Sequence, residues 1–213
     1  MRSMLFLLLA LAACGEKTET NLSGPDQPGW SGPAGEAEPT GKLDRSHAGE
    51  SAPATEFQDP DDAPASLADF RGRPVLLNLW ATWCPPCVAE MPTLDRLASR
   101  EGDRLQVLTV SQDLDGREKV EAFFARQGYR NLETWLDPHM ALMTELRADT
   151  LPTTILYDAR GRELWRMVGM ENWESGRAAL LLKEGLGPPS PDRSAITPLP
   201  AGERRGPPRS GGR

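Results

Sequence analysis

The chain has 213 residues and a formal net charge of −7 at pH 7. Nucleic-acid binding depends on a basic surface, so this acidic balance makes nucleic acid an unexpected partner. A structural zinc site requires four ligands, and beside three cysteines the chain has only two histidines, His47 and His139. We therefore expect neither a bound metal nor a cofactor.

The first residues have the features of an export signal. Arg2 precedes an apolar run over residues 4–13, and that run is about half of the ~20 residues that span a bilayer as a helix. Residues 11–15 (LAACG) resemble a bacterial lipobox, which implies a signal peptide over residues 1–13 and lipid attachment to Cys14. We therefore expect an extracytoplasmic lipoprotein held on the membrane through Cys14. An ordinary secretory signal with a chance cysteine is the alternative.

Composition divides the rest of the chain into three parts. Residues 14–55 are rich in Gly, Pro, Ser, Thr and acidic residues and lack apolar periodicity, so we expect a flexible, lipid-anchored tether there. Residues 56–187 have the size of one domain with a single core. Residues 188–213 are rich in Pro, Gly and Arg, which predicts a disordered basic tail. Contact of this tail with anionic lipid is an open alternative.

Strand and helix patterns alternate between residues 56 and 187. The apolar run over residues 75–80 is typical of a strand buried on both faces. Met91, Leu94, Leu97 and Ala98 are spaced three and four residues apart, which predicts one apolar helix face. The further expected elements are a strand over 105–110, a helix around 120–124, a short strand over 132–136, a brief helix over 141–146, a hairpin over 153–157 and 164–168, and a helix over 175–184. This order predicts an α/β fold in which helices flank a central mixed sheet.

Two cysteines follow the first core strand at the spacing of a redox-active dithiol. Cys84 and Cys87 form the only cysteine pair outside the leader, so their pairing has one solution. Because a helix is expected to begin at this motif, the first thiol lies at a helix N-terminus, where N–H groups and the dipole stabilise a thiolate. We expect Cys84 to be the nucleophile and Cys87 to be the shielded, resolving thiol. Pro85 and Pro86 suit the first helical turn, whose N–H groups have no partners to lose.

Four segments, in order, resemble thioredoxin-fold oxidoreductases of the TlpA/ResA type. They are residues 67–74 (LADFRGRP), residues 80–87 (WATWCPPC), Pro92 and residues 151–154 (LPTT). The resemblance covers about residues 54–186 and implies a thioredoxin-like fold with thiol-disulfide oxidoreductase activity. It also implies that the region around residues 132–146 is the family's insertion between the βαβ and ββα halves.

The resemblance implies two further catalytic residues. Glu90 follows Cys87 by one helical turn and matches an acidic residue near the active site, so it would accept the Cys87 proton, which the amide of Asn78 cannot do. A solvated surface glutamate is the alternative, because this spacing places Glu90 next to Cys87 on the helix but does not determine whether its side chain is buried. Pro152 matches a cis-proline whose loop faces the disulfide and presents backbone to an extended substrate. The expected substrate surface consists of Trp83, Pro85, Pro86, Leu151 and Thr153.

The function implied by the resemblance is reduction of disulfides in exported proteins by a membrane-tethered enzyme. Such relatives act in cytochrome c maturation, on apocytochrome c, or in assembly of the copper centre of cytochrome oxidase. A thiol-transferring membrane protein would supply the electrons. A copper carrier that uses the two thiols and a methionine, such as Met167 or Met170, is one alternative. A disulfide oxidant or isomerase is another alternative, because the same residues serve the reduction, oxidation and isomerisation of disulfides.

Overall fold

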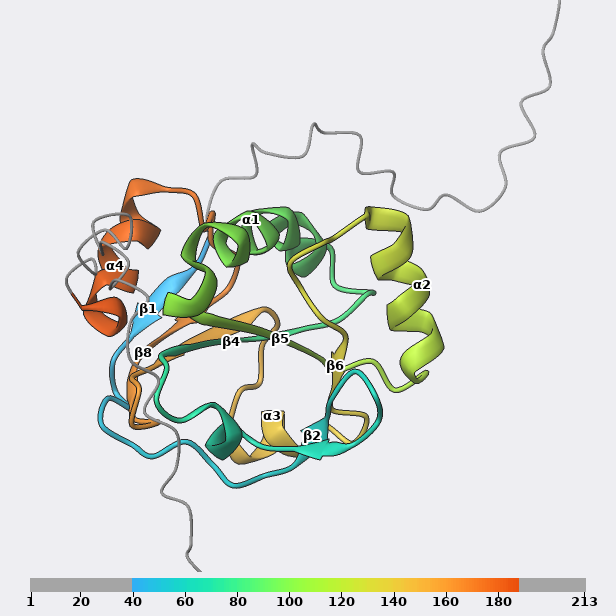
Figure 1. Ribbon diagram of the computed structural model, residues 1–213, viewed down its shortest axis with the longest axis horizontal. Helices are drawn as coiled ribbons and strands as arrows, with labels where there is room; N and C mark the ends of the chain where they lie inside the picture. The colour runs from blue at the N-terminus through green and yellow to red at the C-terminus, as the bar shows by residue number, and fades with distance from the viewer. Residues whose placement is uncertain (1–39, 188–213) are drawn as a thin grey trace, which may run out of the picture. The chain divides into compact units, whose positions relative to one another are not determined.

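The computed structural model describes residues 40–187, which belong to one compact unit. In this part of the chain eight strands form a mixed sheet in the order β1-β8-β7-β4-β5-β6-β2-β3 (Figure 1). The predicted signal peptide, the lipidation site Cys14, the first part of the predicted tether and the basic tail lie outside the described residues. No helix between residues 40 and 187 combines the length and the apolar character that crossing a bilayer requires.

The centre of the sheet consists of the four strands predicted for the core. All six residues of β4 (Val75–Trp80) are buried, which explains its continuous apolar run. β4 pairs in parallel with β5 (Gln106–Ser111) and antiparallel with β7 (Thr153–Tyr157). β8 (Glu163–Val168) in turn pairs antiparallel with β7, and the two strands form the predicted hairpin. The βαβ and ββα halves therefore share one mixed sheet.

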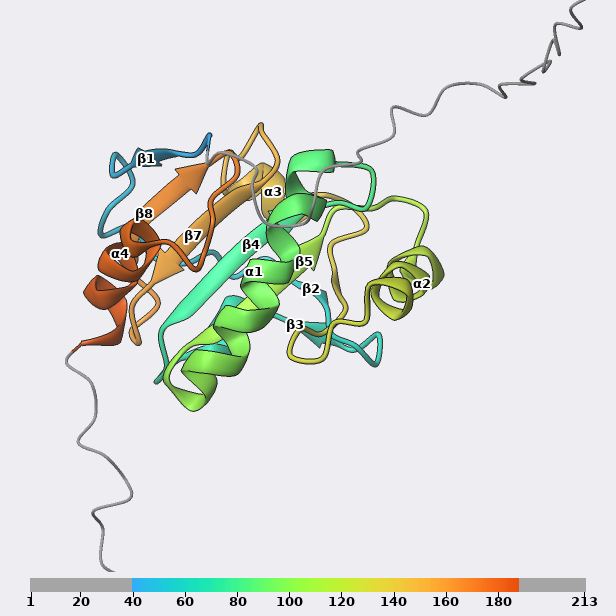
Figure 2. The same cartoon turned by 90° about the horizontal axis from the view of Figure 1, so that it is seen from above.

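Helices cover both faces of this sheet. In the view from above, α1 (Pro85–Glu101), α2 (Arg117–Gln127) and α4 (Gly176–Leu186) lie in front of the sheet and the short α3 (Ala141–Glu145) lies behind it (Figure 2). The core on the α1 side includes Trp80, Met91, Leu94, Leu97, Phe123, Phe124 and Leu182, and the core on the other face includes Phe57, Leu77, Leu79, Leu142 and Ile155. The predicted α/β architecture is confirmed.

Residues 40–55 correct the predicted tether. β1 (Lys42–Asp44) pairs antiparallel with β8 and adds an edge strand to the sheet, and Ser51 forms an isolated bridge with Arg162. The prediction of a flexible tether over residues 14–55 is therefore wrong for its last part. An edge strand is held by backbone hydrogen bonds and needs little apolar surface. Two of the three β1 residues are exposed, so neither composition nor periodicity reveals the strand.

The predicted insertion adds a strand to the other side of the sheet. β6 (Trp135–Leu136) pairs in parallel with β5 and antiparallel with β2 (Phe57–Gln58). β2 also pairs with β3 (Pro64–Ala65), so an N-terminal hairpin forms the far edge. The strand predicted over residues 132–136 is shorter than expected, and the brief helix predicted after it is α3. In sequence the insertion lies between the two halves, whereas in the sheet β6 lies beyond β5, on the side away from β1.

Candidate active site

The disulfide lies where the chain passes from β4 to α1. Cys84 is the N-cap of α1, and Pro85 and Pro86 occupy the first positions of the helix. The sulfur atoms of Cys84 and Cys87 are 2.10 Å apart, and their Cα atoms are 5.3 Å apart. The Cys87 N–H donates to Cys84 Sγ at 3.3 Å. The first thiol therefore lies at a helix N-terminus, as the sequence predicts.

The two cysteines differ in their surroundings. Cys84 is 5% exposed and Cys87 is fully buried, whereas Pro85 and Pro86 are exposed. An incoming sulfur atom can therefore approach Cys84, while Cys87 is covered by the helix and the core. The N–H groups and dipole of α1 stabilise a thiolate at Cys84 after reduction. This geometry favours Cys84 as the attacking thiol and Cys87 as the resolving one.

Glu90 is buried inside the domain, one helical turn after Cys87. Its side chain accepts hydrogen bonds from the Asn78 amide at 2.6 Å and from the Glu171 N–H at 3.0 Å. Burial raises the pKa of Glu90 to about 8, although these two hydrogen bonds oppose the rise. A carboxyl group with this pKa exchanges protons near neutral pH and suits a general base. Glu90 is therefore not the solvated surface residue of the alternative interpretation.

Asn78 connects Glu90 to the strand that follows Pro152. Its amide nitrogen donates to Glu90 Oε1 and also to Thr154 Oγ1 at 2.9 Å. Sequence reasoning excluded the Asn78 amide as a proton acceptor and predicted neither of these contacts. The partners lie 12 and 76 residues away along the chain. The β4–β7 pairing brings Thr154 to Asn78, and the packing of α1 on the sheet brings Glu90 to it. Asn78 thus fixes Glu90 relative to the sheet.

Pro152 directly precedes β7, at the same end of the sheet as the disulfide. The Leu151–Pro152 peptide bond is cis, as the resemblance implies. The next residue, Thr153, lies opposite Leu79 on β4. Thr153 is buried, and its hydroxyl donates to the Thr150 carbonyl at 2.7 Å. Its side chain therefore does not reach the substrate surface predicted for it, because β7 turns that side chain inward.

Comparison with known families covers all of these residues. The sequence pattern of the Redoxin family matches residues 47–181. The chain belongs to the Redoxin family. The matched range contains the disulfide, Glu90 and the Pro152 loop, so the site lies within the family's own domain.

Curated relatives of this Redoxin protein are named as thiol-disulfide enzymes. The thiol:disulfide interchange protein DsbE of Vibrio cholerae is 34% identical over 148 residues, which are 67% of this chain and 78% of the relative. The thiol-disulfide oxidoreductase ResA of Bacillus cereus is 28% identical over 126 residues, which are 59% and 72% of the two chains. The Redoxin protein is therefore a thiol-disulfide oxidoreductase of the DsbE/ResA type.

Solved structures agree with the fold of this Redoxin protein. The exposed lipoprotein thioredoxin of Streptococcus pneumoniae aligns with a TM-score of 0.53 and 26% identity, over 61% of this chain and 98% of that one. A thioredoxin-like protein of Neisseria meningitidis, described as a putative thioredoxin, aligns with a TM-score of 0.56 and 28% identity, over 63% and 88%. The thioredoxin-like fold is confirmed.

Asp113 is a site residue of the Redoxin protein that sequence reasoning missed. It is buried beside the loop that precedes Cys84, where its carboxylate accepts from the Thr82 N–H at 2.8 Å and the Thr82 hydroxyl at 2.6 Å. Burial opposes the charge, but these bonds and the Ser111 hydroxyl lower the pKa of Asp113. The exposed Trp83 follows Thr82 directly. Asp113 therefore holds the segment that leads to Trp83 and Cys84.

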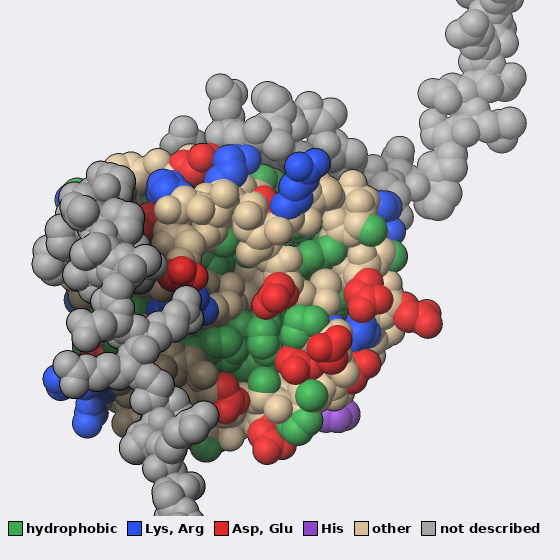
Figure 3. All heavy atoms as spheres, in the orientation of Figure 1, with side chains coloured by type: hydrophobic (Ala, Val, Ile, Leu, Met, Phe, Trp, Pro, Cys, Tyr) green, Lys and Arg blue, Asp and Glu red, His purple; other side chains and the backbone are tan. Residues whose placement is uncertain are grey.

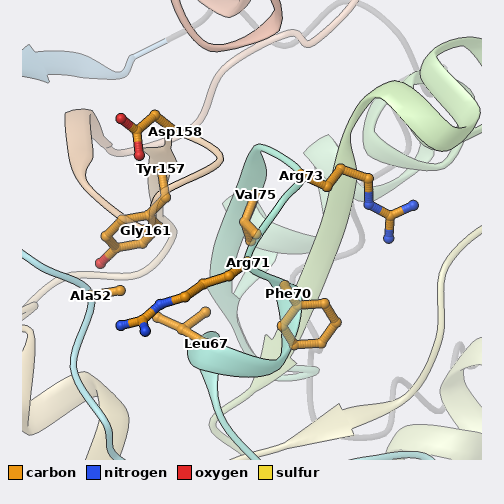
Figure 4. Close-up of a pocket in the computed structure, with 9 residues that line it drawn as sticks. All are labelled: Ala52, Leu67, Phe70, Arg71, Arg73, Val75, Tyr157, Asp158 and Gly161. Carbon is orange, nitrogen blue, oxygen red and sulfur yellow. The ribbon is translucent and has the colours of Figure 1, made fainter.

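The depression in Figure 4 is not part of the redox site of the Redoxin protein. Its lining includes Val75 at the start of β4 and Asp158 and Gly161 in the turn after β7, at the far end of these strands from Cys84. It leaves no space for a water molecule.

Figure 3 shows the face of the molecule at which the C-terminal end of α1 lies. Hydrophobic side chains gather among acidic ones on this face. That face is the end of the molecule away from the disulfide.

The methionine and histidine considered as metal ligands have ordinary surroundings. Met167 is fully buried, and its sulfur lies 3.7 Å from Arg177 Nη2. His139 is exposed beside α3. Among residues 40–187, no three or more His, Cys, Asp or Glu side chains gather in the arrangement of a metal site.

Proposed function

We propose that this thiol-disulfide oxidoreductase is a membrane-tethered, extracytoplasmic reductant that returns disulfides in exported proteins to thiols. The observation that carries the proposal is the buried Glu90 one turn behind Cys87, whose pKa of about 8 suits it to accept a thiol proton. The lipobox around Cys14 supports the location. A similar solved structure is that of an exposed lipoprotein, which also favours it.

The proposed reaction transfers two electrons from the dithiol to the client. The Cys84 thiolate attacks the client disulfide, a bond forms between Cys84 Sγ and one client sulfur, and the other client sulfur leaves as a thiolate. Cys87 then transfers its proton to the Glu90 carboxylate and attacks Cys84 Sγ. The Cys84–Cys87 disulfide forms, and the second client sulfur leaves as a thiolate.

The surface around Cys84 is the proposed place for the client chain. Trp83, Pro85 and Pro86 are exposed beside the disulfide, and the half-buried Leu151 precedes the cis-proline. We propose that an extended client segment lies across these residues and along the Pro152 loop, so that its sulfur reaches Cys84. Thr153 contributes its backbone only.

The proposed clients are exported proteins with cysteine pairs that must be reduced before use. Following the TlpA/ResA resemblance, we propose apocytochrome c or a protein of the cytochrome oxidase copper centre as the client. Each turnover leaves Cys84 and Cys87 oxidised, so a membrane protein that transfers thiol reducing equivalents must restore them. Lipid attachment at Cys14 would keep the domain close to such a donor.

The reduction potential of the Cys84–Cys87 pair tests the direction of the proposed reaction. Equilibration of the purified protein against a defined dithiothreitol or glutathione buffer measures this potential. A value near or below thioredoxin's roughly −270 mV is expected for a reductant. A value near the roughly −120 mV of a strong periplasmic oxidant would contradict the proposal and indicate disulfide formation. Stoichiometric Cu(I) retention by the reduced protein without turnover would favour the copper carrier.

Trapping of the mixed disulfide tests the roles of the two cysteines. In Cys87→Ala the second step cannot occur, so we expect client adducts on Cys84 that a reductant releases, detected on non-reducing gels of the exported full chain. Cys84→Ala is the matched variant, and we expect no adducts and no exchange activity. Adducts on Cys84→Ala in place of Cys87→Ala would reverse the assignment of nucleophile and resolving thiol.

A further inference from the structure

A second buried carboxylate lies directly behind Glu90. Glu171 is in the loop between β8 and α4, and its peptide N–H donates to Glu90 Oε2 at 3.0 Å. Its side chain is fully buried, and Oε1 accepts from the Asn172 N–H at 3.0 Å and the Ser175 hydroxyl at 3.4 Å. Oε2 has no hydrogen-bond donor among the described residues. A buried carboxylate with an oxygen left without a hydrogen bond is costly.

Arg177 supplies the opposite charge at this position. Its Nη1 lies 3.2 Å from Glu171 Oε2, within ion-pair distance, although the alignment is not that of a hydrogen bond. Its Nη2 donates to the Gly41 carbonyl at 3.1 Å, immediately before β1. The Arg177 side chain is 46% exposed. A row of ionisable groups therefore runs from the surface at Arg177 through Glu171 to Glu90.

We propose that Glu171 and Arg177 are positioning residues that set the charge state of Glu90, Glu171 by favouring its protonated form and Arg177 by favouring its ionised form. The proposal rests on the proposed function in one respect, because it matters for catalysis only if Glu90 accepts the Cys87 proton. The physical reason is that charges in a buried, poorly screened region act strongly on one another.

The other groups that face Glu90 do not compete with this pair. On its own helix these are Cys87, which does not titrate in the disulfide, and Thr93, whose hydroxyl donates to the Glu90 carbonyl. From the sheet they are Asn78 on β4 and, through it, Thr154 on β7. All of these are uncharged in the oxidised protein. From the β8–α4 side the facing charges are those of Glu171 and, behind it, Arg177.

The test measures the protonation midpoint of Glu90 directly, by carbon-13 NMR of its carboxyl group in the oxidised full chain. In Glu171→Gln the neighbouring negative charge is lost, so we expect the midpoint to fall by about 0.5–1 pH unit. In Arg177→Met the positive charge is lost, so we expect it to rise by a similar amount. Glu171→Gln keeps an oxygen for the Asn172 N–H and so preserves the loop.

Matched controls come from an exposed ion pair on the same side of the domain. Arg96 and Glu174 are 2.6 Å apart and both about half exposed, so Glu174→Gln and Arg96→Met change the same net charges close by. We expect them to leave the midpoint unchanged within about 0.2 pH unit, because solvent screens exposed charges. Arg177→Lys keeps the charge and loses the guanidinium geometry, and we expect the wild-type midpoint.

Two results would overturn the proposal. One is an unchanged midpoint in Glu171→Gln, and the other is a shift of the same sign in Glu171→Gln and Arg177→Met. The pH dependence of mixed-disulfide resolution separates this proposal from the proposed function. If the midpoint of Glu90 shifts as expected but the rate profile does not follow it, control of the Glu90 charge is supported and its role as the Cys87 proton acceptor is contradicted.

Discussion

Glu90 is the residue at which burial and chemistry meet most directly. Its carboxyl group is enclosed by the domain, and within residues 40–187 it accepts hydrogen bonds from the Asn78 amide and the Glu171 N–H. The neutral acid is therefore favoured in the folded protein, whereas the unfolded chain has an ordinary carboxyl group. Folding and protonation of this residue are consequently linked.

The linkage has a definite sign. The pKa of Glu90 is raised from 4.5 to about 8 on folding, so between these values the folded protein holds a proton that the unfolded chain releases. Glu90 therefore lowers the free energy of unfolding as pH rises through this window, by at most about 1.4 kcal/mol per pH unit. We expect Glu90→Gln to remove this decline, because glutamine does not titrate.

Urea unfolding of the oxidised protein at several pH values checks this prediction. The quantity to compare is the free energy of unfolding of Glu90→Gln minus that of the wild type. This difference should increase as pH rises from about 5 to about 8, because only the wild type loses stability there. Glu121→Gln is the matched control, because Glu121 is exposed on α2 and should leave the pH dependence unchanged. A constant difference across this range would contradict the raised pKa.

At the scale of elements, the loops after β4 and β5 are joined by one buried side chain. Asp113 follows β5 and accepts two hydrogen bonds from Thr82, which follows β4. We expect Asp113→Ala to leave the Thr82 N–H unpaired, to lower the free energy of unfolding by about 1–3 kcal/mol and to reduce kcat/KM for client reduction. The loop that bears Cys84 would lose its fixed position.

Two further variants distinguish positioning from a general loss of stability. Thr82→Val keeps the N–H bond and loses only the hydroxyl bond, so its effects should be smaller than those of Asp113→Ala in both measurements. Asp115→Ala removes an exposed carboxylate two residues away and should change neither. Normal kcat/KM in a folded Asp113→Ala protein would show that the anchor does not matter for the reaction.

Elements with a local signal were predictable, and those held together by distant partners were not. The apolar run of β4 and the period of α1 lie in consecutive residues, so the sequence reports them directly. Glu90 was identified because it lies one turn from Cys87. Its burial could not be predicted, because it depends on Glu171, which is 81 residues away. Asp113 was missed for the same reason, since its partner Thr82 is 31 residues away.

At the scale of the whole molecule, the N-terminal segment is part of the folded domain. β1 pairs with the edge strand β8, Arg45 forms an exposed ion pair with Glu184 on α4, and the Gly41 carbonyl accepts from Arg177. We expect a protein that consists of residues 40–187 to be more stable than one that consists of residues 56–187, by about 1–3 kcal/mol.

Thermal unfolding of the two shortened proteins checks this prediction. The shorter one exposes the backbone of β8 as a new sheet edge, so we also expect it to aggregate more readily. Gly41→Val in the longer protein is an independent variant, because a Cβ at Gly41 would lie 2.7 Å from Met167 Sδ. Gly41→Val should lower the Tm of the longer protein, as removal of residues 40–55 is expected to do. Equal Tm values for the two shortened proteins would show that β1 contributes no stability.

The pairing of β1 also determines at which end of the domain the chain enters. Lys42 lies opposite Val168, Val168 opposite Thr153, and Thr153 opposite Leu79, the residue before Trp80. The chain therefore enters the domain at the end where the disulfide lies, whereas α4 ends at the opposite end, beside the C-terminal end of α1 (Figure 2). Any group attached to the chain before residue 40 is therefore connected to the domain at the end that carries the disulfide. In the proposed membrane-tethered enzyme, the link to the membrane would therefore leave the domain at the end that carries Cys84.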